Sequence, residues 1–207
     1  MAKSSSSRRW LKRQHNDPYV QKAKEEGWRS RASYKLLELN EKDRFLRPGA
    51  AVVDLGAAPG GWCQVAKRVV GDKGVVVAVD ILPMDALNGV SFLQGDFRED
   101  SVLSDLLALV NGQPLDLVLS DMSPNISGLR SVDQPRAMYL VELAWDFAQT
   151  TLRPGGAFVT KALQGEGFDG FYLGLKGRFD SVALRKPKAS RGESREMYVV
   201  ARGFKPV

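Results

Sequence analysis

Short apolar stretches with the character of buried strands alternate with helical stretches along most of this chain, and this alternation limits the fold more than any other feature. The predicted strands are Ala51–Leu55, Val75–Val79, Ser91–Leu93, Leu115–Ser120 and Ala157–Lys161, and the predicted helices lie near residues 61–70, 100–110 and 134–151. Each helix is long enough to connect two parallel strands across a face of a sheet. The pattern therefore predicts an α/β fold with a mostly parallel sheet and helices on both faces.

The two ends of the chain extend this plan. An amphipathic helix is predicted over Ser30–Phe45, and after residue 165 we expect a short helix at Phe168–Lys176, strands at Phe179–Arg185 and Met197–Ala201, and between these the polar loop Lys186–Arg195. Because there is no internal repeat and no boundary, residues 29–207 should form a single domain with a seven-stranded sheet. Residues 1–28 are polar and basic, so we expect a mobile arm with about one helical turn.

Several classes of protein are excluded by what the sequence lacks. The 207 residues include no apolar run of about 18 or more, and no apolar segment of a secretory signal follows the basic N-terminal residues, so we expect a cytoplasmic protein without a membrane span. The single cysteine, Cys63, permits no internal disulfide. The single histidine, His15, leaves almost no material for a Ser-His-Asp triad or a zinc site. Catalysis must then use Lys, Asp, Glu or a bound cofactor, and no metal is expected.

Charge is segregated along the chain. Residues 1–47 hold 13 Lys and Arg against 6 Asp and Glu, residues 48–180 hold 10 against 16, and residues 181–207 hold 7 against 2. Two basic ends around an acidic middle suggest a footprint for a polyanion, most often nucleic acid. The plainer interpretation, solvated faces and a floppy tail, stays open on charge alone.

A glycine-rich turn follows the first predicted strand, in the run VVDLGAAPGGW from Val52 to Trp62. Such a turn lets a ligand approach the backbone at the carboxyl end of a parallel strand, where doubly wound sheets bind cofactors. A dinucleotide site would prefer Gly-x-Gly-x-x-Gly, which requires glycine in place of Ala58 and tolerates Pro59 poorly. NAD is therefore disfavoured, although a tight connection without a ligand remains an alternative.

Two carboxylates favour a cofactor site over a connection without a ligand. Asp80 ends the second predicted strand, where an acid commonly accepts the two hydroxyls of a cofactor ribose, and Asp96 follows the third, where it can accept an adenine amine. With the turn they describe an adenosine pocket. No P-loop Lys-Ser/Thr is present to suggest ATP, so the pattern favours S-adenosylmethionine.

These residues resemble those of a known family, the FtsJ-type ribosomal RNA large-subunit ribose methyltransferases. The resemblance covers nearly the whole chain after about residue 18, through residues 30–32 (SRA), 54–62 (DLGAAPGGW), 82–85 (LPMD), 93–97 (LQGDF), 120–125 (SDMSPN), 135–144 (PRAMYLVELA), 164–168 (QGEGF) and 194–196 (SRE). It implies a class I S-adenosylmethionine-dependent methyltransferase fold, with S-adenosyl-L-methionine as methyl donor. It also implies a catalytic tetrad, which in this chain is Lys35, Asp121, Lys161 and Glu196. The implied cofactor-binding positions are Gly60, Trp62, Asp80, Asp96 and Asp121.

The same resemblance implies the reaction and the partner. The methyl group would pass to the ribose 2'-hydroxyl of a uridine in the A-loop of 23S rRNA, within the large ribosomal subunit. We expect a monomer whose RNA contacts come from the basic arm, the helix that carries Lys35 and the Lys186–Arg195 loop. Residues 1–17 match no motif of the family, so a role for them rests on charge alone.

The predicted sheet independently brings the tetrad to one edge. Asp121 follows the fourth strand and Lys161 closes the fifth, so both should lie beside the glycine-rich turn, with Lys35 approaching from the preceding helix and Glu196 from the last strand. A lysine at such a strand end is either a snorkelling side chain or a functional amine. Trp62 has a plain alternative role as a packing residue at a helix start. Because a ribose hydroxyl is a weak nucleophile, Lys161 would either remove its proton or orient its oxygen.

Two other functions stay under consideration. A base methyltransferase would carry Asn/Asp-Pro-Pro-aromatic after the fourth strand, but the segment from Asp121 to Asn125 has no aromatic residue to stack on a flipped base. A catalytically inactive RNA-binding factor in ribosome assembly is the third hypothesis, and the intact tetrad argues against it.

Overall fold

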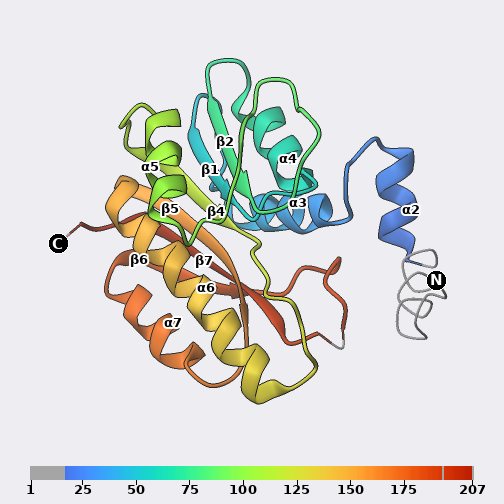
Figure 1. The fold of residues 1–207 in the computed structure, drawn as a ribbon, viewed down its shortest axis with the longest axis vertical. Coiled ribbons are helices and arrows are strands. Elements are labelled where there is room, and N and C mark those ends of the chain that lie inside the picture. Colours follow the sequence, from blue (N-terminus) through green and yellow to red (C-terminus); the bar gives the residue numbers. More distant parts are fainter. Residues whose placement is uncertain (1–16, 193, 207) are drawn as a thin grey trace.

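The computed structural model describes residues 17–192 and 194–206, and it has one seven-stranded sheet between two layers of helices (Figure 1). The strands lie in the order β3-β2-β1-β4-β5-β7-β6. Strand β7 runs antiparallel to both of its neighbours, and the other pairs are parallel. The predicted α/β fold, with a seven-stranded, mostly parallel sheet and helices on both faces, is confirmed. The strands are β1 Ala51–Leu55, β2 Val75–Asp80, β3 Ser91–Gln94, β4 Leu115–Ser120, β5 Leu152–Leu163, β6 Phe179–Arg185 and β7 Glu196–Phe204.

The helices cover the two faces of the sheet unequally. They are α2 Pro18–Glu25, α3 Ala32–Asp43, α4 Gly61–Val70, α5 Asp100–Leu109, α6 Arg130–Thr151 and α7 Phe168–Lys176. Side chains alternate between faces along each strand, so Val52 packs in the core with α3 and α4, whereas Val53 and Leu55 pack in the core with α5, α6 and α7. Every strand residue therefore belongs to a defined face, and this decides which side chains can meet.

The carboxyl ends of the parallel strands are level. Leu55 in β1 pairs with Ser120 in β4, and Ser120 pairs with Thr160 in β5. Because β7 is antiparallel to β5, its first residue reaches the same edge, where Glu196 pairs with Leu163. One edge of the sheet thus collects residues that are far apart in the sequence.

The segment before the domain differs from the expectation. Residues 18–25 form an eight-residue helix, α2, that begins after Asp17, whose carboxylate accepts the backbone N–H of Tyr19 at 3.0 Å. An Asp cap followed by proline in the first turn is a strong helix start. Ala23 of α2 is buried in a small cluster with Tyr34 and Ala189. The expectation of about one helical turn in the basic arm is therefore corrected to this longer helix, and residues 1–16 of the arm lie outside the residues described.

Other differences are small. Helix α6 begins at Arg130, ahead of the expected start near residue 134, and β5 continues past Lys161 to Leu163. Among the residues that the structure describes, no helix is long and apolar enough to cross a membrane.

Candidate active site

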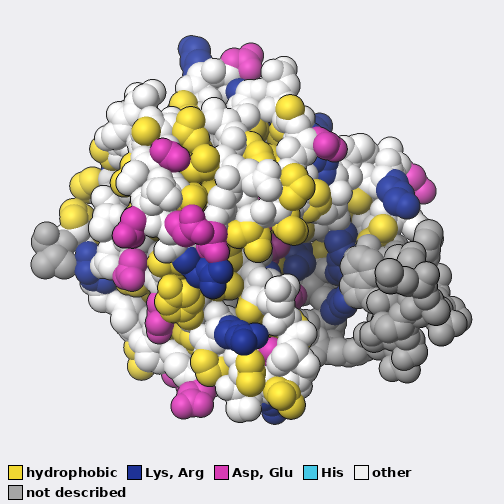
Figure 2. Space-filling model, viewed as in Figure 1, with side chains coloured by type: hydrophobic (Ala, Val, Ile, Leu, Met, Phe, Trp, Pro, Cys, Tyr) yellow, Lys and Arg dark blue, Asp and Glu magenta, His cyan; other side chains and the backbone are white. Residues whose placement is uncertain are grey.

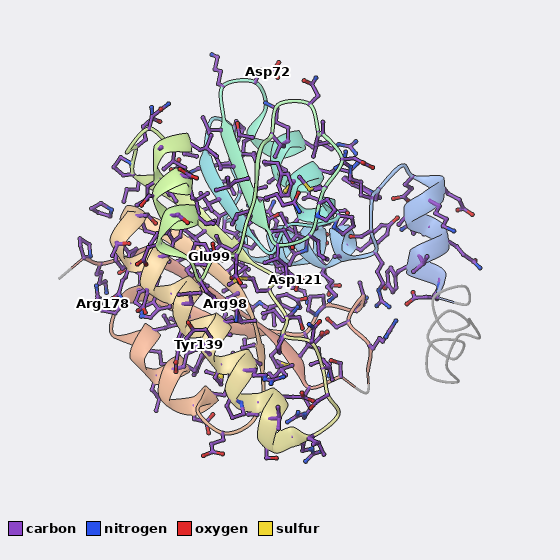
Figure 3. The ribbon with its side chains drawn as sticks, viewed as in Figure 1. Asp72, Arg98, Glu99, Asp121, Tyr139 and Arg178 are labelled. Carbon is purple, nitrogen blue, oxygen red and sulfur yellow. The ribbon has the colours of Figure 1, made fainter. Side chains whose placement is uncertain are left out.

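Lys161 and Asp121 meet at the carboxyl edge of the sheet. Asp121 directly follows β4, lies near the middle of the molecule in Figure 3, and donates its backbone N–H to the carbonyl of Leu55 at 3.2 Å. The ammonium of Lys161 donates to the backbone carbonyl of Asp121 at 2.7 Å and lies 3.1 Å from its carboxylate. The Lys161 side chain is only 8% exposed. This amine is therefore held inside the site and is not a strand end that reaches into solvent.

Tyr198 joins a second lysine to this pair. It lies directly opposite Lys161 in the β5–β7 ladder, so both side chains lie on the sheet face that α3 covers. Its hydroxyl donates to the carboxylate of Asp121 at 3.0 Å and accepts from the ammonium of Lys35, on α3, at 2.8 Å. Lys35 also lies 3.6 Å from the carboxylate of Glu196. The structure thus brings the four expected residues together around Tyr198, which the sequence analysis did not identify.

The charges in this cluster reinforce one another. Burial alone would raise the pKa of Asp121, but Lys161, Lys35 and the Tyr198 hydroxyl outweigh it and hold that pKa below its ordinary value. Burial, together with the carboxylates of Asp121 and Glu196, raises the pKa of Tyr198 well above its ordinary value. At neutral pH, Asp121 is therefore an ionised acceptor and Tyr198 keeps the proton that it donates.

The glycine-rich turn lies at the same edge and has the shape of a cradle. Gly56 and Gly60 have φ angles of 78° and 102°, which side chains rarely allow. A Cβ atom on Gly60 would lie 2.9 Å from Sδ of Met84 and 3.0 Å from the guanidinium of Arg29. Gly60 caps α4, whose first backbone N–H groups have no acceptor within the helix. Such a helix start suits an anionic group, for example a carboxylate.

Asp80, at the end of β2, leaves room for two hydroxyl groups. One carboxylate oxygen accepts the backbone N–H of Ala58 and the other that of Leu82, each at 2.8 Å. Because each oxygen can accept two hydrogen bonds, both keep one free position, which matches the two hydroxyls of a ribose. With the cradle and the free N–H groups of α4, this donor and acceptor set fits S-adenosylmethionine.

Asp96, after β3, already has a partner. It accepts the backbone N–H of Arg98 at 3.0 Å and its guanidinium at 2.9 and 2.5 Å, and these hydrogen bonds lower the pKa of Asp96. The Arg98 side chain, labelled in Figure 3, is largely exposed. An adenine amine would therefore share this carboxylate with Arg98 or displace its exposed guanidinium.

Trp62 differs from the other expected cofactor residues because its side chain faces the core. It is buried, its indole N–H donates to the carbonyl of Ala32 at 2.9 Å, and its ring lies 5.8 Å from that of Tyr198. The side chain thus packs behind Tyr198, and only the backbone of Trp62, in the first turn of α4, remains to contact a cofactor.

Asp54, like Tyr198, is a residue of this region that was not expected from the sequence. This β1 residue is fully buried, one carboxylate oxygen accepts from Sγ of Cys63 at 3.0 Å, and the other has no hydrogen-bond partner among the described residues. Burial raises the pKa of Asp54 to about 7, and the neighbouring charges of Asp121 and Asp80 act in the same direction. A buried carboxyl group with a pKa near neutral pH therefore lies close to both Asp121 and Asp80.

Comparison with known proteins identifies the family. The sequence profile of the FtsJ-like methyltransferases matches residues 28–204. The chain belongs to the FtsJ-like methyltransferase family. The ribosomal RNA large subunit methyltransferase E of Pseudomonas aeruginosa is 58% identical over 205 residues, 99% of each chain, and that of Hahella chejuensis is 60% identical over 205 residues, 99% of this chain and all of that one.

A solved structure agrees with this. A Plasmodium falciparum protein described as a ribosomal RNA methyltransferase matches with a TM-score of 0.78 and 30% identity, over 87% of this chain and all of that one. In the present chain the family match over residues 28–204 includes the glycine-rich turn and all of Lys35, Asp121, Lys161, Glu196 and Tyr198. Helix α2 precedes it, although the Pseudomonas and Hahella relatives align along nearly the full chain.

Sequence reasoning missed three residues of the site. Tyr198 has the appearance of a core residue in an apolar strand, and only its position two residues after Glu196 places both on one face. Arg29 donates to the backbone carbonyls of Asp85 and Ala86, each at 2.7 Å, and so ties the segment before α3 to the loop after β2. Arg98 is an exposed arginine two residues after Asp96, and no pattern in the sequence marks it.

Proposed function

We propose that this FtsJ-like methyltransferase transfers the methyl group of S-adenosylmethionine to a ribose 2'-hydroxyl of large-subunit ribosomal RNA. The target would be a uridine of the 23S A-loop, and the protein would act as a monomer on the large subunit in the cytoplasm. The observation that carries the proposal is the buried Lys161–Asp121–Tyr198–Lys35 cluster beside the glycine-rich turn. The relatives named as ribosomal RNA large subunit methyltransferases support the substrate.

The cofactor would be held by residues at the ends of four strands, β1 to β4. Gly60 leaves space at the turn, while its own N–H already donates to the carbonyl of Ala57 at 2.7 Å, so the N–H groups in the first turn of α4, at Trp62, would take the cofactor carboxylate. Asp80 suits its ribose and Asp96 its adenine amine, and Asp121 lies where β4 ends, between them and the lysines. S-adenosylmethionine supplies a methyl group that the positive charge of its sulfur already activates. The main task left to the protein is to align the ribose oxygen with that methyl group.

Lys161 is the residue that we assign to this alignment. Its ammonium has three N–H donors, and the carbonyl and carboxylate of Asp121 take two of them. The third is free to hold the ribose oxygen in line. Tyr198 donates to the same carboxylate oxygen of Asp121 that faces Lys161, Lys35 donates to the hydroxyl of Tyr198, and Glu196 balances the charge of Lys35. Orientation by a rigid, charge-balanced cluster supports catalysis because little reorganisation is needed when the substrate binds.

The RNA would lie across basic residues next to this cluster. Helix α2, the start of α3 and the 186–195 loop are neighbours, since Ala23, Tyr34 and Ala189 pack together. Figure 2 has several Lys and Arg side chains gathered between the body of the domain and α2. Exposed cations on these elements include Lys22, Lys24, Lys186, Lys188 and Arg191. Phosphate contacts release counterions, so RNA affinity should fall steeply as salt rises.

The test is methylation of large ribosomal subunits from a strain that lacks this modification. Purified protein, labelled S-adenosylmethionine and these subunits should give 2'-O-methyluridine, identified by mass spectrometry of nucleosides from the digested RNA. A methyl group on a base would instead favour a base methyltransferase. RNA binding without any methyl transfer would favour an assembly factor. Either result would overturn the proposal.

A further inference from the structure

The loop that follows Asp121, residues 122–129, is tightly held at its far end by Asp133 of α6. One carboxylate oxygen of Asp133 accepts from the backbone N–H and the hydroxyl of Ser127, both at 2.8 Å, and the other accepts from the backbone N–H of Gly128 at 2.9 Å. The Asp133 side chain is buried. A buried carboxylate with three such donors fixes the backbone of the loop, which we call the β4–α6 loop.

This fixed loop exposes two large apolar side chains. Ile126 is 62% exposed and Leu129 is 64% exposed, within four residues of each other. A single exposed aliphatic residue is ordinary, but two on a short, ordered loop beside a reaction centre suggest a surface that is covered during function. Arg130 and Arg136 are exposed just after them, and neither forms an ion pair with a described carboxylate.

The loop runs between the glycine-rich turn and the carboxyl end of β5. At its start Met122 lies against the glycine-rich turn, because a Cβ atom on Gly56 would be 2.7 Å from the Met122 side chain. Just beyond its end, Gln134 donates to the carbonyls of Leu163 and Glu166 at 3.1 and 3.0 Å. In Figure 1 the loop runs from β4 to the start of α6 on the same side of the view as residues 186–195.

We propose that the β4–α6 loop is a contact surface for the RNA substrate, on which Ile126 and Leu129 pack against nucleobases next to the target ribose and Arg130 binds a phosphate. Base faces are apolar enough to pack on aliphatic side chains, and a flanking arginine matches the charge of the backbone. Asp133 is a positioning residue for this surface. The inference rests on the proposed ribose methylation, since the occupant is the RNA that presents the hydroxyl to Lys161.

The test measures kcat and KM for undermethylated large subunits, together with cofactor affinity by calorimetry. The main variant combines Ile126→Ser and Leu129→Ser, and the matched control is Leu173→Ser on α7, where the leucine is 61% exposed. The double variant should raise KM by roughly tenfold or more and leave cofactor affinity within about twofold of wild type. The control should change neither value. Asp133→Ala should raise KM in the same way although both apolar side chains are still present.

Each other outcome is decisive. An unchanged KM in the double variant would overturn the proposal, and weaker cofactor binding would make the loop a cover for the cofactor. An equal rise in KM for Leu173→Ser would assign the effect to general loss of surface apolarity. If the wild-type protein methylates no ribose, the proposed function fails and this surface with it. If the wild type is active and the variants match it, only the surface fails.

Discussion

Removing one oxygen atom from Tyr198 tests the organisation of the proposed catalytic cluster, Lys35, Asp121, Lys161, Glu196 and Tyr198. Tyr198→Phe keeps the ring that packs against Trp62 but removes the hydroxyl that bridges Lys35 at 2.8 Å and Asp121 at 3.0 Å. A hydrogen bond to a charged group contributes about 1.5–3 kcal/mol. Both charged partners keep another contact, Lys35 with Glu196 and Asp121 with Lys161. We therefore expect the loss of about one such bond in the transition state, roughly a ten- to hundredfold fall in kcat.

The assay is single-turnover methylation of undermethylated large subunits, with cofactor affinity measured by calorimetry. The matched control is Tyr172→Phe, because Tyr172 on α7 also has a bonded hydroxyl, which donates to the carbonyl of Val182 at 3.2 Å, but takes no part in the site. The Tyr198 variant should bind cofactor within about twofold of wild type, since the adenosine contacts proposed for Asp80 and Asp96 are unchanged.

Two results would refute this reasoning. A kcat within twofold of wild type would mean that the hydroxyl bridge does not organise the cluster. An equal loss in the Tyr172 control would mean that loss of any hydrogen-bonded tyrosine hydroxyl lowers activity through stability alone. Melting temperatures of both variants separate these cases from simple unfolding.

Three further predictions concern single residues. Lys161→Arg should lose at least about 2.7 kcal/mol of transition-state stabilisation, on the order of a hundredfold in rate, because a planar guanidinium cannot replace a compact amine held by Asp121. A loss of only a few-fold in the methylation assay would move the central role to Lys35. Asp80→Ala should weaken cofactor binding by roughly ten- to hundredfold in calorimetry, and an unchanged affinity would place the ribose elsewhere. The variant should also have a lower melting temperature, because the N–H groups of Ala58 and Leu82 lose their acceptor. Asp54 has a pKa of about 7 in the folded state and about 3.9 in the unfolded state, so the unfolded chain loses this proton at lower pH. The free energy of unfolding should therefore fall by about 2 kcal/mol from about pH 5.5 to 8. Denaturant titrations of Asp54→Asn should lack this contribution, and an identical pH dependence in both proteins would refute the assignment.

Much of the site could be predicted because parallel strands place their ends together. The positions of Asp80, Asp96 and Asp121 follow from the strand pattern, and each lies at or just after a strand end in the structure. Lys161 stands out because a charged residue in an apolar strand needs a reason. These predictions depend only on local patterns and on a general property of the fold.

The parts that could not be predicted depend on long-range packing. Ala23 of α2 packs with Tyr34 and with Ala189, which is far away in the sequence, so the polar composition of this segment did not indicate the contact. The partnership of Arg98 with Asp96 involves an exposed side chain that has many rotamers available. The Asp133 contacts that fix the β4–α6 loop likewise appear only once the helix and the loop are placed together.

The direction of β7 decides whether a catalytic cluster can exist at this edge. Because β7 is antiparallel to β5, Tyr198 lies opposite Lys161, and Glu196 lies two residues closer to the edge on the same face. A parallel β7 would carry its first residues to the far end of the sheet. A register slip of one residue would turn Tyr198 toward α6 and put Met197 or Val199 beside the lysine. Lys35 would then lose the hydroxyl that connects it to Asp121. The one strand that departs from the parallel pattern is therefore the one that links the second lysine to the cofactor side of the site.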